Sequence, residues 1–289
     1  MAWINYHGHS NYCDGKEVPE EYVKNAILNK MPVLGISSHS PVPFRSSWNM
    51  KAENLKSYLA DIKNLKQKYK STIQVYCGLE VDFIPAISGP SSFPGLDYNI
   101  GSIHYIDTFP NGKYWEIDGP HLGFLDGLKE IFNNDIKKAV GRYFELTRQM
   151  LTEDVPDILG HLDKIKIQNE EGKLFSESDQ WYKDQIEETL RIIKLKDVIV
   201  EVNTRGIYKK KSLETYPSAW ILKRIYELGI PVLLSSDAHH PGELIELFPK
   251  VSQQLLEIGF KTTKIFYNNT WVDTDLFQDG VHLNNTSLI

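Results

Sequence analysis

The chain has 289 residues, 41% of them apolar and 24% charged, which is sufficient for one large hydrophobic core. Its net charge is −6 and no cluster of five or six basic residues occurs, so we expect no nucleic-acid partner. Two cysteines do not make a disulfide framework, and neither a signal peptide nor a membrane-spanning apolar run is present. These features predict a cytoplasmic protein without a membrane partner, and they leave its oligomeric state open.

Short apolar runs alternate with amphipathic stretches along most of the chain. We expect strands at residues 3–6, 32–37, 73–78, 98–103, 157–160, 198–202 and 231–234. We expect helices from Pro19 onward and at residues 52–69, 127–153, 178–196, 218–228 and 243–258. This alternation predicts about seven βα units in a parallel α/β sheet or barrel, folded as a single domain over residues 1–289.

Three stretches interrupt the alternation. Residues 84–95 are rich in proline, serine and glycine, and residues 108–123 carry Trp115, Asp118 and His121, so we predict a loop for each. The tail from Thr262 to the end of the chain is predicted to add an edge strand to the sheet and an irregular end.

Residues with metal-binding side chains gather at the expected ends of the strands. The apolar run at 231–234 ends shortly before Asp237 and His239. Glu80 and Asp237 stand at strand ends, and so do six of the nine histidines: His7, His9, His39, His104, His161 and His239. A single histidine of this kind is more often a surface residue or a hydrogen-bonded core residue. So regular a placement instead favours a metal site at the carboxyl ends of the strands.

The spacing of His7, Gly8 and His9 suits a metal ion. Side chains alternate along an extended strand, so the two imidazoles point to the same side, and the glycine between them leaves room for an ion. Imidazole together with carboxylate binds zinc, manganese or iron. A carboxylate shared by two ions can hold a pair that generates hydroxide near neutral pH and supports in-line displacement at phosphorus.

Six motifs occur in a consistent order between residue 3 and about residue 240. They are HGHS at 7–10 followed by Asp14-Gly15, SSHS at 37–40, GLE at 78–80, GSIH at 101–104, GHLD at 160–163 and SSDAH at 235–239. In this order they resemble the PHP (polymerase and histidinol phosphatase) superfamily. The loop at 105–123 and NTRG at 203–206 are most similar to the monofunctional histidinol-phosphate phosphatases. The resemblance implies an α/β fold, a distorted (β/α)7 TIM-like barrel with a trinuclear metal site at its carboxyl-terminal mouth.

The resemblance also implies which residues bind two to three divalent ions, expected to be zinc, manganese or iron. The first ion would be bound by His7, His9, Glu80 and Asp237. The second ion would share Glu80 and add His104 and His161. The third ion would be bound by His39 and His239. Many members of the superfamily supply a further histidine soon after the first motif, and in this chain Asp14 is the nearest candidate.

The implied activity is hydrolysis of L-histidinol phosphate to L-histidinol and phosphate, a phosphoric monoester hydrolase reaction of histidine biosynthesis. A hydroxide bridging two ions would attack phosphorus, with Asp237, His239 and Glu80 as catalytic residues. Either Asp237 or a histidine of the site would protonate the leaving alkoxide. One alternative keeps the fold and changes the substrate to a phosphotyrosine or a small phosphodiester. Another is a metal-binding regulatory protein without turnover, and the complete set of ligand positions argues against it.

A phosphorylated substrate requires cations at the mouth of the barrel. We predict that Arg205, Arg45 and Lys164 contact the small phosphorylated substrate, although each position also suits a solvated side chain. Ser235 is included among the substrate-binding residues, and Ser235 and Asp163 are expected to orient metal ligands.

Overall fold

Seven parallel strands form the centre of the molecule in the computed structural model, which describes residues 1–169 and 172–283. Their order in the sheet is β1-β2-β3-β4-β7-β8-β9, so each strand pairs with the next one along the chain. The strands are β1 (Ile4–Asn5), β2 (Val33–Ile36), β3 (Gln74–Asp82), β4 (Tyr98–Ser102), β7 (Ile158–Leu159), β8 (Ile199–Asn203) and β9 (Val232–Ser235). All seven predicted strands are therefore present.

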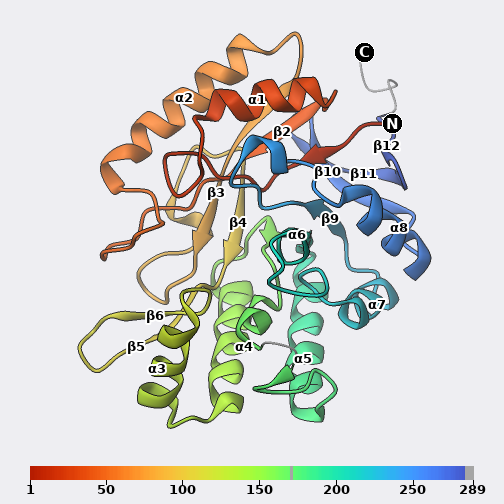
Figure 1. Cartoon of the computed structure of the whole chain (residues 1–289). Coiled ribbons are helices and arrows are strands. Elements are labelled where there is room, and N and C mark those ends of the chain that lie inside the picture. The colour runs from red at the N-terminus through yellow and green to blue at the C-terminus, as the bar shows by residue number, and fades with distance from the viewer. Residues whose placement is uncertain (170–171, 284–289) are drawn as a thin grey trace.

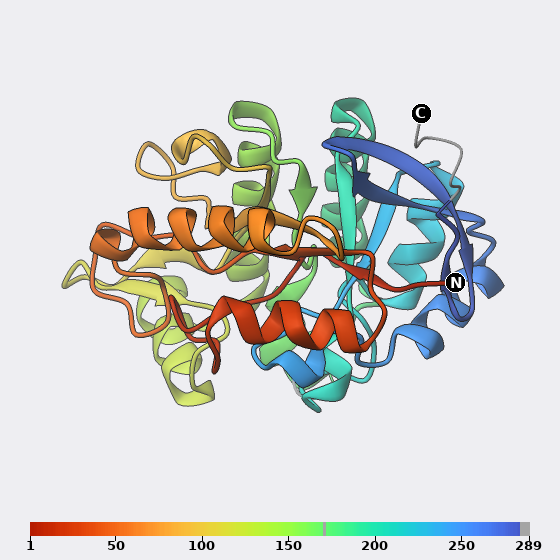
Figure 2. The same ribbon diagram turned by 90° about the horizontal axis from the view of Figure 1, so that it is seen from above.

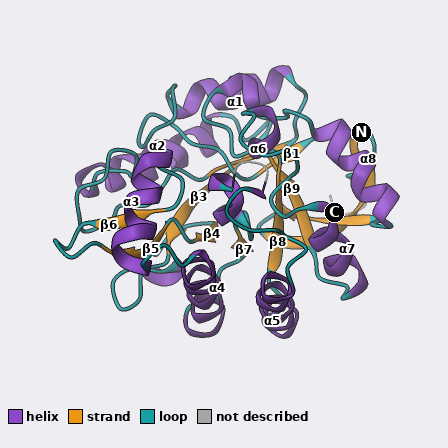
Figure 3. Cartoon of the chain, turned by 60° about the horizontal axis from the view of Figure 1, so that its bottom comes forward, coloured by secondary structure: helices purple, strands orange, loops and turns teal. Residues whose placement is uncertain are grey.

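The first and last strands also meet, and the sheet closes into a barrel (Figure 3). Gly8 and Ala238 form a parallel bridge just beyond the carboxyl ends of β1 and β9. The amide of His9 donates to the carbonyl of Ala238 at 2.7 Å, and the amide of Ala238 donates to the carbonyl of His7 at 3.1 Å. The barrel therefore closes at the end that carries the histidines, and the predicted distorted (β/α)7 barrel is confirmed.

Helices surround the barrel, with α1 and α2 on one side and α4 and α5 on the opposite side (Figure 1). They are α1 (Pro19–Leu28), α2 (Leu55–Lys68), α3 (His121–Phe132), α4 (Ile136–Glu153), α5 (Gln180–Lys196), α6 (Arg205–Tyr208), α7 (Ala219–Glu227) and α8 (Phe248–Ile258). The connection between β3 and β4 holds only a short 3-10 turn, Pro90–Ser92, as the predicted loop there requires. This missing helix is one source of the barrel's distortion.

Strand β3 extends beyond its predicted end at residue 78 and continues to Asp82. Within the extension Glu80 pairs with Ile100 of β4, and it also forms a bridge with His39 beyond β2. Eight of the nine residues of the strand are buried, as expected for a parallel strand covered on both faces. The extension carries Glu80 into the middle of the barrel mouth.

The segment at 108–123, predicted as a loop, is instead an ordered part of the barrel mouth. Strands β5 (Tyr105–Thr108) and β6 (Tyr114–Glu116) form an antiparallel hairpin, and α3 already begins at residue 121. Trp115 is buried, and its ring centroid lies 5.1 Å from that of Phe124. The predicted loop was wrong. The turn-forming residues in this segment indicated a loop, but the apolar residues between them pack on α3 and stabilise the hairpin.

Two further predicted helices have different bounds. The single helix expected at 127–153 is two helices, α3 and α4, because Asn133 and Asn134 both adopt left-handed backbone angles between them. Asparagine tolerates this conformation better than most residues, so the pair ends one helix before the next begins. The last helix begins at Phe248 rather than at 243, after a 3-10 turn at Pro241–Glu243.

The tail forms a separate antiparallel sheet of β10 (Thr262–Tyr267), β11 (Thr270–Phe277) and β12 (Gly280–Val281). The predicted edge strand of the barrel is therefore wrong. The sheet packs on the amino-terminal end of the barrel: Thr263 Oγ1 donates to the carbonyl of Val232 at 3.0 Å, and Val281 bridges Ala2. Figure 2 shows the amino-terminus beside these strands. Residues 284–289 of the predicted irregular end lie outside the described part of the chain.

An aromatic cluster joins this sheet to the barrel, and we call Tyr6, Tyr98, Phe266 and Trp271 the aromatic floor. The Tyr6 hydroxyl donates to the carbonyl of Phe266 at 2.8 Å and accepts from its amide at 2.8 Å. The Tyr6 ring lies 5.6 Å from the rings of Tyr98 and Trp271. The tail thus shares one hydrophobic core with the barrel. Among the described residues, no helix is long and apolar enough to cross a membrane.

Candidate functional site

The structure brings together, at the carboxyl-terminal mouth of the barrel, all nine side chains that the sequence predicts as metal ligands. His7 and His9 follow β1, His39 follows β2, His104 follows β4 and His161 follows β7. Asp237 and His239 follow β9, Glu80 lies within β3, and Asp14 lies in the turn before α1. Their convergence follows from the topology, because the carboxyl ends of parallel strands all meet at one mouth.

The first group of ligands lies at the seam where the barrel closes. Glu80 Oε2 is 3.1 Å from His7 Nε2 and 3.4 Å from His9 Nε2. Asp237 Oδ1 is 3.1 Å from His9 Nε2 and 3.7 Å from His7 Nε2. The side chains of all four residues are at most 4% exposed. Two imidazoles and two carboxylates therefore face one point in the interior.

The second group shares Glu80 through its other oxygen. Glu80 Oε1 is 2.8 Å from His161 Nε2 and 3.6 Å from His104 Nε2. Since Oε2 faces the first group, Glu80 lies between the two groups. A carboxylate that bridges two metal ions would occupy this position.

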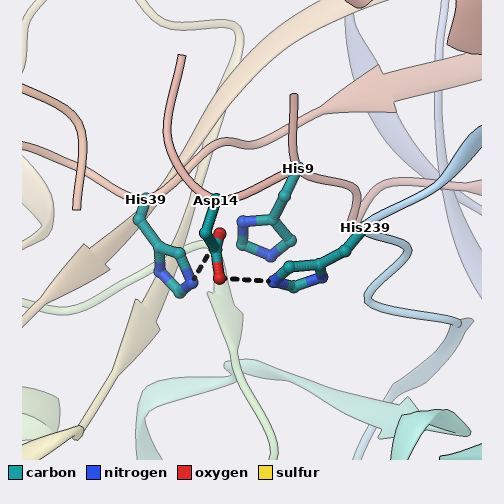
Figure 4. A group of neighbouring side chains, drawn as sticks. All are labelled: His9, Asp14, His39 and His239. Carbon is teal, nitrogen blue, oxygen red and sulfur yellow. Dashed lines mark ion pairs between the residues drawn. The ribbon is translucent and has the colours of Figure 1, made fainter. Parts of the chain in front are cut away.

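The third group, shown in Figure 4, comprises His9, Asp14, His39 and His239. The carboxylate of Asp14 lies between two imidazoles: its Oδ2 is 3.2 Å from His239 Nε2, and its Oδ1 is 3.9 Å from His39 Nε2. The predicted stand-in for a missing histidine is thus placed within reach of the other two donors. His9 contributes to both this group and the first.

Several of these atoms are buried without a hydrogen-bond partner among the described residues. They include His7 Nε2, His9 Nε2, His39 Nδ1, Glu80 Oε2 and Asp237 Oδ1. A buried polar atom that makes no hydrogen bond costs free energy, and native proteins contain few of them. Here they are concentrated at one place and face one another. A donor set of this kind fits divalent metal ions, which would satisfy these atoms together.

The electrostatics of the group keep its carboxylates ionised. Burial alone would raise the pKa of Glu80, but the imidazoles of His7, His39 and His104 lower it well below its ordinary value. Burial would likewise raise the pKa of Asp237, but His7 and Arg205 lower it well below the usual range. Ionised carboxylates are the form that binds metals.

Asp237 is held in an unusual backbone conformation. Its φ is +51°, in the left-handed region that few non-glycine residues adopt. Arg205 Nη1 donates to the carbonyl of Asp237 at 2.8 Å, and the hydroxyl of Tyr208 donates to the carbonyl of Ser236 at 2.8 Å. Side chains of α6 therefore stabilise the strained turn that directs Asp237 toward His7 and His9.

Glu201 is a site residue that the sequence analysis missed. It is fully buried in the middle of β8, where His7 Nδ1 hydrogen-bonds to its Oε1, and its Oε2 accepts from the amide of His161 at 2.7 Å. Such a carboxylate fixes the tautomer and orientation of the imidazole, whose other nitrogen faces Glu80. The sequence feature that could have identified it is the single glutamate within the apolar run VIVEV. A charged side chain in a buried strand is stable only if it has a hydrogen-bond or ion-pair partner.

Asp82 was also missed, and it serves His104 in the same way. Asp82 Oδ1 lies 2.8 Å from His104 Nδ1, and its Oδ2 accepts from Asn49 Nδ2 at 3.0 Å. Because its position relative to Glu80 is two residues along an extended strand, both carboxylates point into the mouth.

A cavity of about 550 Å³ opens above the ligands and is lined by Asp14, His39, Asp237 and His239 on its floor. Two of the residues predicted to contact substrate, Lys164 and Arg205, line its walls. Lys164 Nζ pairs with Asp118 Oδ2 at 3.1 Å and lies 3.2 Å from His104 Nε2. Burial would raise the pKa of Asp118, but the ammonium of Lys164 lowers it to about 2. The cavity wall therefore carries fixed charges of both signs.

Three other predicted residues lie elsewhere. Arg45 is exposed, and it is not among the described residues that line the cavity. Ser235 is fully buried and its hydroxyl donates to Glu201, so it supports the site from below. Asp163 was expected to orient a metal ligand, but it pairs with Lys166 at 2.8 Å and accepts from the amide of Ser218 at 3.1 Å.

The family model described as PHP domain matches residues 5–205. The chain belongs to the PHP family. Curated relatives of this PHP chain include a "Probable histidinol-phosphatase" of Deinococcus radiodurans, 28% identical over 263 residues, covering 89% of this chain and 94% of the relative. A histidinol-phosphatase of Bacillus subtilis is 23% identical over 258 residues, covering 82% of this chain and 94% of the relative.

A solved structure matches almost the whole of this PHP chain. The histidinol phosphate phosphatase of Lactococcus lactis, complexed with zinc, L-histidinol and phosphate, aligns with a TM-score of 0.67 and 19% sequence identity. The alignment covers 97% of this chain and 99% of the Lactococcus protein. At this level of identity the match shows the fold, a closed barrel of PHP type.

Proposed function

We propose that the chain is a metal-dependent phosphatase that hydrolyses L-histidinol phosphate to L-histidinol and phosphate. The proposal is supported by the buried donors at the mouth of the barrel, whose unpartnered atoms face one another beneath an open cavity. Relatives that match along nearly their whole length are histidinol-phosphatases by name. A cavity of about 550 Å³ suits a small phosphorylated metabolite.

We assign the metal-binding residues by group. One ion would be held by His7, His9, Glu80 and Asp237, and a second by Glu80, His104 and His161. A third would be held by Asp14, His39 and His239. Divalent ions bound in this way, such as zinc, manganese or iron, lower the pKa of water and neutralise charge that develops on a phosphoryl group.

The protein's own cations would hold the phosphoryl oxygens. Arg205 and Lys164 line the cavity next to Asp237 and His104, and Lys209 and Lys211 also line it. Arg205 is fixed by its hydrogen bond to the carbonyl of Asp237, so its guanidinium is already oriented when substrate arrives. Lys164 is oriented by Asp118 in the same way. Because its pKa is held low, the carboxylate of Asp237 is ionised, the form in which it would bind a metal ion.

The test is phosphate release from L-histidinol phosphate, measured beside p-nitrophenyl phosphate and a dinucleotide, with metal content determined on the same sample. We expect a preference of several hundredfold in kcat/KM for L-histidinol phosphate, which is roughly 3–4 kcal/mol of transition-state discrimination. Treatment with a chelator should abolish the activity, and zinc or manganese should restore it. Equal turnover of the other esters would overturn the substrate assignment, and activity that survives complete metal removal would overturn the metal assignment.

A further inference from the structure

The charges on the cavity wall are unevenly distributed. Arg205, Lys209 and Lys211 line the side formed by α6 and the residues after it. Glu116 and Asp118 line the side formed by the end of the β5–β6 hairpin. Asp118 is paired with Lys164, whereas Glu116 forms no ion pair with a described residue. The hairpin side thus presents one carboxylate whose charge is not compensated by the protein.

The carboxylate of Glu116 is held in a fixed position. Its backbone pairs with Tyr105 in the hairpin, and its Oε2 accepts a hydrogen bond from Trp48 Nε1 at 3.0 Å. A Cβ atom built on Gly119 would lie 2.5 Å from Glu116 Oε1, so the carboxylate in this position packs closely against the glycine. Gln168 Nε2 in turn donates to the carbonyl of Gly119 at 2.9 Å and fixes the turn. The hairpin, Trp48 and the turn at Gly119 therefore hold the Glu116 carboxylate in place, although it forms no ion pair with a described residue.

Trp48 connects this carboxylate to the metal ligands. Its ring centroid lies 4.5 Å from that of His39 and 5.2 Å from that of His104. It also stacks on Tyr105 at 5.3 Å, which fixes the indole. Glu116 is thus separated from the ligand groups by one aromatic side chain, and it lines the same cavity as His39 and Asp237.

We propose that Glu116 binds the ammonium group of the substrate and thereby selects phosphate esters of amino alcohols. The inference rests on the proposed function. In L-histidinol phosphate the ammonium is attached two carbons from the ester oxygen, so it lies close to the reacting phosphoryl group. A carboxylate accepts strong charge-assisted hydrogen bonds from ammonium. An ester without the amine gains nothing from Glu116.

The experiment compares Glu116→Gln with wild type on two esters, L-histidinol phosphate and imidazolylpropyl phosphate, which lacks the amine. We expect kcat/KM for L-histidinol phosphate to fall roughly ten- to hundredfold in the variant, as loss of a charged hydrogen bond predicts. The value for imidazolylpropyl phosphate should change less than about twofold, because that ester makes no contact through an ammonium. Glu130→Gln, the same change on the exposed face of α3, is the matched control and should leave both values unchanged.

Binding of L-histidinol to the metal-loaded protein, measured by calorimetry, gives a readout independent of turnover. Glu116→Gln should weaken this binding by a factor similar to its loss in kcat/KM. Equal losses on both esters, or no loss on L-histidinol phosphate, would overturn the ammonium site. If wild type fails to hydrolyse L-histidinol phosphate, the proposed function is overturned, and calorimetry still decides whether Glu116 binds the amine.

Discussion

The two ends of the barrel are built from the same strands but differ in how fully their buried polar groups are hydrogen-bonded. At the amino-terminal end, the aromatic floor is packed ring against ring, and the Tyr6 hydroxyl makes both of its hydrogen bonds with the backbone of Phe266. At the carboxyl-terminal mouth, several buried nitrogens and carboxylate oxygens, among them His7 Nε2 and Asp237 Oδ1, face one another without hydrogen bonds. The packed and hydrogen-bonded side chains at the amino-terminal end stabilise the fold. The buried polar atoms without partners at the mouth cost free energy and are available to bind a ligand.

The strongest way to test this contrast is Asp237→Asn at the mouth. The substitution removes one charge from the first ligand group while keeping its shape, so hydrolysis should fall by more than about a hundredfold. The fold should be retained, because asparagine keeps the shape of the side chain and Asp237 Oδ1 has no hydrogen-bond partner among the described residues. Turnover and urea unfolding on the same preparation would check both expectations. Full activity in this variant would contradict the assigned site.

The converse change is Phe266→Ala in the aromatic floor. The Phe266 ring is buried against Tyr76 at 4.8 Å and Trp271 at 5.0 Å, so its loss should destabilise the protein by about 3 kcal/mol or more. The kcat of the folded fraction should remain unchanged. Urea unfolding and steady-state kinetics below the unfolding transition would measure the two effects. A large drop in kcat without a loss of stability would break the division between the two ends.

Glu201→Gln tests the layer beneath the mouth. Glu201 orients His7 and accepts from the amide of His161, so the substitution should weaken metal affinity by roughly ten- to hundredfold. Activity should recover when the metal concentration is raised, which distinguishes an orienting residue from a direct ligand. Metal affinity measured by competition with a chelating dye is the readout, and an unchanged affinity would show that His7 needs no such support.

Tyr6→Phe gives the smallest expected effect. It removes a hydroxyl that bonds the carbonyl and amide of Phe266 but keeps the ring in its aromatic contacts. The free energy of unfolding should fall by about 1–2 kcal/mol, since one buried amide loses its partner. Thermal or urea unfolding would measure the change, and the metal content should stay the same. A loss of bound metal would mean that the two ends of the barrel are coupled.

Most of the fold and the convergence of the candidate ligands could be predicted because both follow periodic, local rules. Apolar runs separated by helical stretches give parallel strands, and a histidine directly after such a run must lie at the mouth. Glu201 and Asp82 could not be found in this way, since they lie within strands and act on residues distant in sequence. The substrate contacts were harder to predict. Arg45 lies in a loop, and a loop has no regular repeat from which the direction of a side chain can be inferred.

The hairpin and the tail show a second limit. Their folding depends on packing partners elsewhere: Trp115 on α3, and Phe266 on Tyr6 and Tyr98. Turn-forming residues between short apolar runs look the same whether or not such a partner exists. The sequence of residues 108–123 therefore predicted a loop where the three-dimensional contacts produce a hairpin.

The closure of the barrel by Gly8 and Ala238 also has a consequence for biosynthesis. His7 and His9 leave the ribosome first, whereas Asp237 and His239 emerge more than two hundred residues later. A nascent chain therefore carries some of its ligands long before it can complete a single ion-binding group that includes Asp237. We expect tight binding of the ions that need Asp237 or His239 to wait until the final strand has inserted, so that occupancy of these two groups indicates an assembled barrel.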